Sequence, residues 1–365
     1  MSPASGFIQL LAIFMYINPH FQETNRIFPE PGRYGYVRFD MNENPIGLPI
    51  EFVEKVKKAI TPEFLATYPE TQAFTKKYAR FIGMEPENIM TTNGSDMGIR
   101  YLLETFGKPG SKVVTVSPSF EMYRINCSLL GLRHAPIDYN ADLSFDYQNL
   151  LNAIDAETSV VSLLNPNNPI GNVFSADEVE AVIQKAQSVG ALVIIDEAYH
   201  YFHPITFLHF IRQYDNVVIL RTFSKCFSLA GCRLGVIIGP KLLIQAVTHA
   251  RLTFDVNSIA LLFGEALLDE PEILVQLIES EKSGKIYLIS EIERHGYSYM
   301  GGAGNYIFIK PKLNPSVLAE KPQTGSKILV KTFGHPLLRN YIRVTTGNKA
   351  SMDLFLNAFL KEDNN

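Results

Sequence analysis

The feature of this sequence that most constrains its fold is an alternation, from about residue 50 onward, of amphipathic segments with short segments rich in β-branched residues. Amphipathic periodicity is typical of helices that cover a sheet, and short apolar runs are typical of strands buried on both faces. Strands and helices in alternation predict a mostly parallel sheet joined by crossover helices. We therefore expect an α/β fold with buried strands at 112–117, 159–164, 191–196, 216–222 and 234–238.

Helical periodicity fills several of the gaps between these strands. It is clearest at 95–106, 119–130 and 176–188, and Ser175 with Glu178 matches the capping box that begins a helix. We therefore expect helices on both faces of the sheet.

After about residue 250 the alternation stops. A long helical pattern at 257–294 is followed by strand-like segments and a terminal helix, at 305–310, 327–333, 341–345 and 350–360. The change of pattern predicts a second, smaller α+β domain.

The length of 365 residues, with 46% hydrophobic and 19% charged residues, is sufficient for about two globular domains. Residues 18–49 are rich in Pro, Gly and Asn and have little periodicity, which is typical of an extended arm. We predict an N-terminal extension and arm over 1–49, a large domain over 50–255 and a small C-terminal domain over 256–365.

Charge and cysteine content exclude several classes of function. The net charge is -4 and there is no run of Lys or Arg, so we expect no nucleic-acid partner. The three cysteines, Cys127, Cys226 and Cys232, form no CxxC pair, which favours a reducing compartment and a cytoplasmic location. The apolar stretch at 6–17 is shorter than the roughly 20 residues that a membrane span needs. We expect no membrane attachment, and we interpret residues 1–14 as an extension upstream of a functional chain that begins near Met15.

Ligands of open α/β sheets bind beyond the carboxyl ends of the strands, and the segments at these ends are rich in polar groups. The segment 93–98 (NGSDMG) joins a strand to a helix, where backbone N–H groups favour an anion, although a plain Asn-Gly turn would explain it alone. The segment 165–171 (NPNNPIG) has two Asn-Pro steps that would hold an amide side chain rigidly.

Two ionisable residues follow the next two strands. Asp196 ends an apolar strand, and a buried carboxylate there needs a cation or a donor as its partner. Lys225 has small and apolar neighbours, an environment that lowers the pKa of an amine and makes it a nucleophile. An anion site, an amide, a buried acid and a reactive lysine together are what pyridoxal 5'-phosphate requires. His200 and His203 do not favour a metal site, because no third ligand is suitably spaced.

The segments NPNNPIG, IIDEAYHYF and TFSKCFSLAGCRLG occur in this order, with 28 residues from Asn168 to Asp196 and 29 from Asp196 to Lys225. In these motifs the chain resembles the fold-type I, pyridoxal-phosphate-dependent aminotransferases of class I and II. The pattern is most similar to that of histidinol-phosphate aminotransferases, over residues 18–359. The resemblance implies a large cofactor-binding domain and a homodimer with shared active sites.

The resemblance also implies roles for individual residues. Lys225 matches the lysine that binds the cofactor, Asp196 the partner of the ring nitrogen, and Asn168 and Tyr199 the donors to the ring oxygen. Lys225, Asp196 and Tyr199 are thus the expected catalytic residues. The resemblance also implies that Phe120 stacks on the cofactor ring and that Tyr68 reaches the cofactor of the neighbouring subunit. The expected phosphate cup consists of Ser95, Asp96, Thr222, Ser224 and Arg233.

On the substrate side, Arg343 matches the arginine that binds the substrate's acid group, and Asn42 lies in a segment that resembles the family's N-terminal substrate loop. Many histidinol-phosphate enzymes have a second arginine where this chain has Lys331. Lysine keeps the positive charge but cannot form two parallel hydrogen bonds to one anion. The resemblance therefore implies recognition of a second anion by Lys331 less directly than an arginine would.

The implied reaction is transfer of an amine from an amino acid or a phosphorylated amine, with histidinol phosphate favoured, to 2-oxoglutarate. Two alternatives use the same cofactor residues: decarboxylation of a phosphorylated amino acid such as phosphothreonine, and transamination of aromatic amino acids. A module that binds the cofactor without turnover is disfavoured, because the lysine is present and no DNA-binding segment is added.

Overall fold

The computed structural model describes residues 16, 19–22, 32–320 and 327–364. The proposed extension at 1–14 and, apart from Tyr16, the apolar stretch at 6–17 lie outside the described residues. No helix in the described part of the chain is both long and apolar enough to cross a bilayer.

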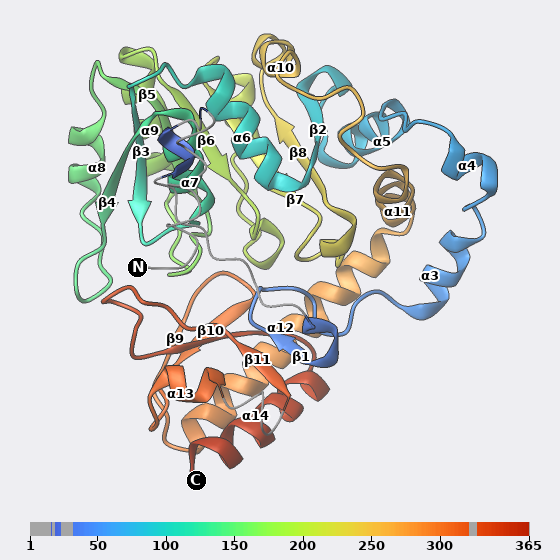
Figure 1. The fold of residues 1–365 in the computed structure, drawn as a ribbon, viewed down its shortest axis with the longest axis vertical. Helices are drawn as coiled ribbons and strands as arrows, with labels where there is room; N and C mark the ends of the chain where they lie inside the picture. The colour runs from blue at the N-terminus through green and yellow to red at the C-terminus, as the bar shows by residue number, and fades with distance from the viewer. Residues whose placement is uncertain (1–15, 17–18, 23–31, 321–326, 365) are drawn as a thin grey trace.

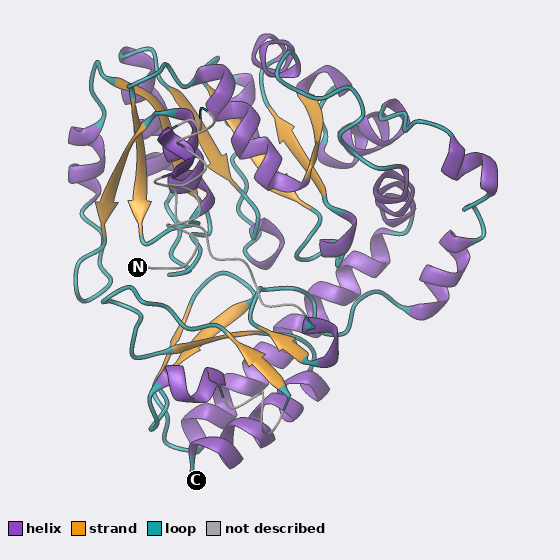
Figure 2. Ribbon diagram, viewed as in Figure 1, coloured by secondary structure: helices purple, strands orange, loops and turns teal. Residues whose placement is uncertain are grey.

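A seven-stranded sheet forms the larger part of the molecule, and a separate small sheet lies below it (Figure 2). The order is β2-β8-β7-β6-β5-β3-β4, and only β8 runs antiparallel to its neighbours. The five strands expected from the sequence are present to within one residue at each end, which confirms the α/β fold. The bounds are β2 (Ile89–Asn93), β3 (Lys112–Ser117), β4 (Arg133–Asp138), β5 (Thr158–Leu164), β6 (Leu192–Asp196), β7 (Val217–Thr222) and β8 (Leu234–Ile238).

Helices cover both faces of this sheet because successive side chains of a buried strand point to opposite faces. On β6, Ile195 belongs to one apolar cluster and Ile194 to the other. The first cluster includes side chains from α3 (Ile50–Lys57), α5 (Gln72–Ile82), α8 (Tyr147–Ala153), α9 (Ala176–Ser188) and α11 (Ser258–Asp269). The second includes α6 (Gly94–Phe106), α7 (Met122–Leu130) and α10 (Lys241–Thr248).

Three segments differ from the sequence-based expectation. The helix expected from residue 119 begins at Met122, so residues 118–121 form a connection at the end of β3. The helical pattern at 257–294 is two helices, because Pro271, which has no N–H, begins α12 (Pro271–Arg294). The edge strand β4 was missed, because Pro136 and its polar neighbours obscure the strand pattern.

The small lobe contains the antiparallel sheet β12-β10-β9 and, across it, the long helix α12 packed beside the terminal helix (Figure 1). The arm joins this lobe, since β1 pairs in parallel with β11. Bounds in this lobe are β1 (Val37–Phe39), β9 (Tyr299–Gly301), β10 (Tyr306–Ile309), α13 (Pro315–Glu320), β11 (Ile328–Val330), β12 (Ile342–Thr345) and α14 (Lys349–Asp363).

The other described elements are short: α2 (Pro19–Gln22), α4 (Pro62–Ala66), and the 3-10 helices η1 (Arg33–Gly35), η2 (Pro86–Asn88), η3 (His200–Phe202), η4 (Leu208–Arg212) and η5 (Ala230–Cys232). The predicted division at 49/50 and 255/256 remains a prediction. Helix α11, just after the second boundary, contributes Ala260 and Leu261 to the core of the large sheet.

Candidate functional site

The candidate site lies at the carboxyl edge of the large sheet. Strands β5, β6 and β7 run in parallel, and β2 points the same way because β8 is antiparallel to both β2 and β7. The segments that follow these four strands therefore meet at one edge. They carry most of the predicted cofactor residues, and the arm and the small lobe contact them from the other side.

Lys225 follows β7 and is partly buried. Its Nζ donates a hydrogen bond of 2.8 Å to the backbone oxygen of Met41 in the arm. Burial lowers the pKa of Lys225 to about 8, the Arg343 guanidinium acts in the same direction, and Glu43 opposes it. An appreciable fraction of this amine is therefore neutral and nucleophilic near neutral pH.

Asp196 ends β6 and is only 2% exposed. Tyr123 donates its hydroxyl to Oδ2 at 3.0 Å, and the amide of Ala198 donates to Oδ1 at 3.1 Å. Burial raises the pKa of Asp196 to about 7, although both hydrogen bonds favour the charged form. Within the described residues Asp196 makes no ion pair, so its partners here are two neutral donors.

The residues of the predicted phosphate cup lie together where α6 begins beside the segment after β7. Arg233 donates from Nη2 to Asp96 at 3.0 Å and from Nη1 to Ser224 Oγ at 3.3 Å. Gly94 has a φ of 70°, a backbone conformation that favours glycine, and a Cβ atom there would lie 2.3 Å from Arg233 Nη2, so a larger residue would displace this guanidinium. Ser95 and the Thr222 hydroxyl, which donates to Ser224 Oγ at 3.0 Å, complete the group of five predicted cup residues.

Arg343 on β12 connects the small lobe to the large sheet and to the arm. Its Nη1 donates to Asn168 Oδ1 at 2.6 Å, and its Nη2 donates to the Asp40 backbone oxygen at 2.8 Å. The guanidinium lies between the rings of Tyr306 and Phe333, at 5.2 and 5.3 Å from their centroids. Its Nε is buried and has no hydrogen-bond partner within the described residues.

Tyr199 and Asn42 form a second link between the lobes. The amide Nδ2 of Asn42 donates to the Tyr199 hydroxyl at 2.9 Å, and its backbone N–H donates to Thr345 Oγ1 at 2.9 Å. Asn42 is 1% exposed and has a positive φ of 55°. Burial raises the pKa of Tyr199, so its hydroxyl stays neutral and able to donate.

The remaining predicted residues lie in more open positions. Lys331 pairs with Arg343 through the backbone, and its side chain is exposed. Tyr68 is 72% exposed and stacks on Phe254, with ring centroids 4.3 Å apart. Phe120 is partly buried against the second apolar cluster, in the connection before α7.

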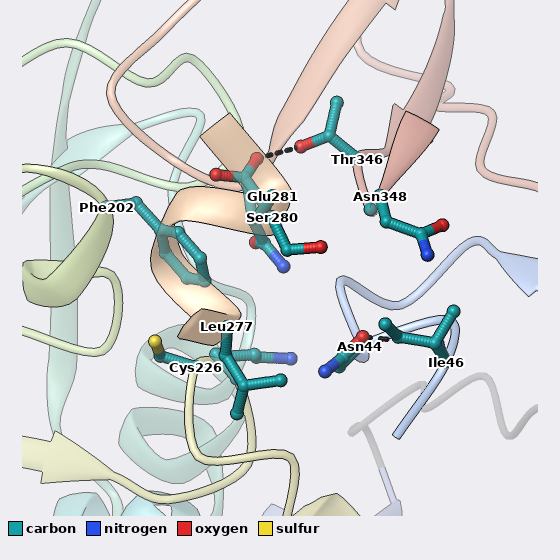
Figure 3. Close-up of a pocket in the computed structure, with 12 residues that line it drawn as sticks. Asn44, Ile46, Phe202, Cys226, Leu277, Ser280, Glu281, Thr346 and Asn348 are labelled. Carbon is teal, nitrogen blue, oxygen red and sulfur yellow. Dashed lines mark hydrogen bonds between the residues drawn. The ribbon is translucent and has the colours of Figure 1, made fainter. Parts of the chain in front are cut away.

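A pocket opens beside Lys225, between the arm and helix α12 (Figure 3). Asn44 and Ile46 line it from the arm, and Leu277, Ser280 and Glu281 line it from the helix. Thr346 donates a hydrogen bond to Glu281, and burial raises the pKa of this carboxyl group. Lys225 thus lines a pocket between the arm and the small lobe.

Sequence reasoning missed two groups of contacts made by the predicted site residues. Tyr123 was visible only as an aromatic residue three positions after Phe120, with nothing in the pattern to point it at Asp196. The backbone oxygens of Asp40 and Met41 bind Arg343 and Lys225, and backbone acceptors leave no signal in the residue types.

The comparisons with known proteins agree with this geometry. The family model "Aminotransferase class I and II" matches residues 34–359. The chain belongs to this family of aminotransferases. The resemblance inferred from the motifs is thus confirmed, and with it the enzyme class, a pyridoxal-phosphate-dependent aminotransferase.

The names of individual relatives are more specific than the description of the family. The chain is 30% identical to a histidinol-phosphate aminotransferase of Ruminiclostridium cellulolyticum, over 88% of this chain and 90% of the relative. It is 29% identical to that of Clostridium novyi, over 93% and 95%. The crystal structure of the Sinorhizobium meliloti histidinol-phosphate aminotransferase in complex with pyridoxal-5'-phosphate has a TM-score of 0.85 at 23% identity, and covers 96% of this chain and 98% of that one. At that identity the structural likeness establishes the fold.

Proposed function

We propose that this aminotransferase binds pyridoxal 5'-phosphate through Lys225 and transfers an amine from histidinol phosphate to 2-oxoglutarate, a reaction of histidine biosynthesis. The observation that carries the proposal is that one edge of the sheet holds both Lys225, whose pKa is lowered, and Asp196, a buried acid. Within the described residues Asp196 has no cationic partner. The names of the relatives support histidinol phosphate as the donor.

The donor set of the site fits the cofactor. A protonated ring nitrogen is the cation that a buried carboxylate such as Asp196 requires. Asn168 accepts from Arg343 through Oδ1, which leaves its Nδ2 to donate to the ring oxygen. Tyr199 accepts from Asn42, so its own hydroxyl hydrogen is free to donate as well. Arg233, Ser224 and the first N–H groups of α6 suit a phosphate.

Pyridoxal phosphate supplies a conjugated ring that withdraws the electrons left on the substrate carbon when its proton is removed. Lys225 Nζ would accept that proton, because a pKa of about 8 gives it both a neutral fraction and sufficient basicity. Asp196 would hold the proton of the ring nitrogen. Asn168 and Tyr199 would orient the ring by donating to its oxygen.

Substrate recognition is assigned to the arm and the small lobe. Arg343 would bind an acid group with the guanidinium edge that includes its unpaired Nε. Lys331, exposed beside it, would contact a distal anion such as a phosphate. Asn42 remains a candidate substrate contact, although its amide nitrogen is engaged by Tyr199.

The active sites would be shared in a homodimer, and the enzyme would be cytoplasmic. The exposed, stacked pair Tyr68 and Phe254 supports an interface at this surface. Mixing Tyr68→Phe with Lys225→Ala, each impaired alone, should restore wild-type composition in up to about a quarter of the sites. Verified subunit exchange without recovery would assign Tyr68 to its own subunit or to no site.

The donor is tested with a panel of amines in the presence of 2-oxoglutarate. Glutamate formation should be fastest with histidinol phosphate and slower with phenylalanine, tyrosine or phosphothreonine. A preference for an aromatic amino acid would replace the proposed donor. Release of CO2 from phosphothreonine without glutamate formation would identify a decarboxylase instead.

A further inference from the structure

Tyr123 is a buried residue of α7 whose hydroxyl reaches the end of a strand on which the proposed chemistry depends. Its side chain is 1% exposed and packs in the second apolar cluster, and its hydroxyl donates to Asp196 Oδ2 at 3.0 Å. Burial and the charge of Asp196 raise the pKa of Tyr123 well above its usual range. The hydroxyl therefore remains neutral and able to donate at neutral pH.

The other groups near Asp196 do not replace this donor. The Ala198 amide occupies Oδ1, and the carboxylates of Asp96 and Glu197 both disfavour the charged form of Asp196. The Glu197 carboxylate also forms a buried ion pair with Arg221, at 2.7 Å, and donates nothing to Asp196. Tyr199 is neutral. Tyr123 is thus the one side chain within the described residues that donates a hydrogen bond to this carboxylate.

We propose that Tyr123 is a positioning residue that keeps the Asp196 carboxylate ionised and holds its free lone pairs toward the ring nitrogen of the cofactor. Asp196 can retain a proton on that nitrogen only while it is itself ionised. A hydrogen bond to a charged acceptor favours ionisation, and a carboxylate oxygen held at a fixed hydroxyl cannot rotate away. The role rests on the proposed use of pyridoxal phosphate.

The first test uses the protein without cofactor, so that its outcome is independent of the proposed function. The pKa of Asp196 is raised in the folded state above its unfolded value, so its contribution to stability is complete below about pH 4 and is lost as the pH rises through about 7. The free energy of unfolding is measured from pH 4 to 9 for wild type and Tyr123→Phe, each relative to its own Asp196→Asn partner. This difference isolates Asp196 from the other titrating groups.

Loss of the donor should raise the pKa of Asp196 further. The decline with pH in the Asp196 contribution to the free energy of unfolding should therefore extend about one pH unit higher in Tyr123→Phe than in wild type. Tyr147→Phe is the matched control, because it removes a tyrosine hydroxyl that donates to the backbone oxygen of Glu178 in the same lobe. It should leave the Asp196 curve unchanged. Superimposable curves for Tyr123→Phe and wild type would overturn the inference.

The second test measures cofactor affinity by fluorescence titration of the protein without cofactor. Tyr123→Phe should bind pyridoxal phosphate about ten-fold more weakly, and should bind an analogue with carbon in place of the ring nitrogen as well as wild type does. Equal weakening of both ligands would make Tyr123 merely structural. Failure of wild type to bind either ligand would overturn the proposed function, and the unfolding curves would still decide whether Tyr123 sets the pKa of Asp196.

Discussion

The two sides of Lys225 are constructed differently. On the large-lobe side, Asp196, Ser224 and Asn168 each lie within a few residues of the end of a strand in one sheet. On the arm side, Asn42 and Thr345 meet across 303 residues of sequence, as do Asp40 and Arg343. The first set is positioned by strand geometry and the second by the docking of the arm and the small lobe, so we expect the first to govern chemistry and the second to govern substrate choice.

Among the substitutions that test this comparison, Lys225→Ala should have the largest effect on activity. Alanine has no amine to bind the cofactor or to accept a proton, so turnover should fall by more than roughly 10^4-fold. The cofactor's lysine-linked visible absorbance should disappear as well. Activity is measured by glutamate formation and folding by circular dichroism.

Lys241→Ala, an exposed lysine on α10, is the matched control and should keep full activity. Persistence of the lysine-linked absorbance in Lys225→Ala would show that another lysine binds the cofactor, and the role proposed for Lys225 would be wrong.

Asp196→Asn should have the next largest effect. The amide cannot stabilise a protonated ring nitrogen, so kcat should fall by about 10^3-fold while the cofactor stays bound. The exposed Asp177→Asn on α9 is the control, and should be unaffected. A nearly active Asp196→Asn enzyme would indicate that the electrons of the reaction are stabilised by some other group.

The same contrast explains what could be predicted from the sequence. Asp196 and Lys225 were found because parallel strands bring their carboxyl ends together, so chain position alone implies proximity. The contacts of Arg343 with the Asp40 backbone and with Asn168 depend on tertiary docking, and no local pattern encodes them. The start of α7 at Met122 was likewise missed, since the residues before it are compatible with a helix but form a connection.

Arg343→Lys tests the arm side of the comparison. Lysine keeps the charge but loses the planar fork, so KM should rise by about ten-fold to a hundred-fold for both the amine donor and 2-oxoglutarate, with a smaller change in kcat. Arg339→Lys, an exposed arginine of the same lobe, should change neither KM. Unchanged KM values in Arg343→Lys would move the substrate's acid group to other residues of the arm, with Tyr34 and Tyr36 next to be tested.

The smallest and most selective effect should come from Lys331→Ala. The backbone of Lys331 pairs with that of Arg343, while its side chain is exposed and free to follow a distal group of the substrate. Removal of one positive charge should raise KM by about ten-fold for histidinol phosphate or phosphothreonine, and should leave an aromatic amino acid unaffected. Initial rates with each donor at saturating 2-oxoglutarate measure this selectivity.

Lys310→Ala, an exposed lysine at the end of β10, controls for a general loss of positive charge in the small lobe. If Lys331→Ala raises KM equally for all donors, Lys331 acts by supporting β11 and Arg343, and the preference for a phosphorylated donor must arise elsewhere. A selective loss would show that the arm side recognises a phosphate through Lys331, because an aromatic amino acid, which carries a carboxylate but no phosphate, would not be affected by the change.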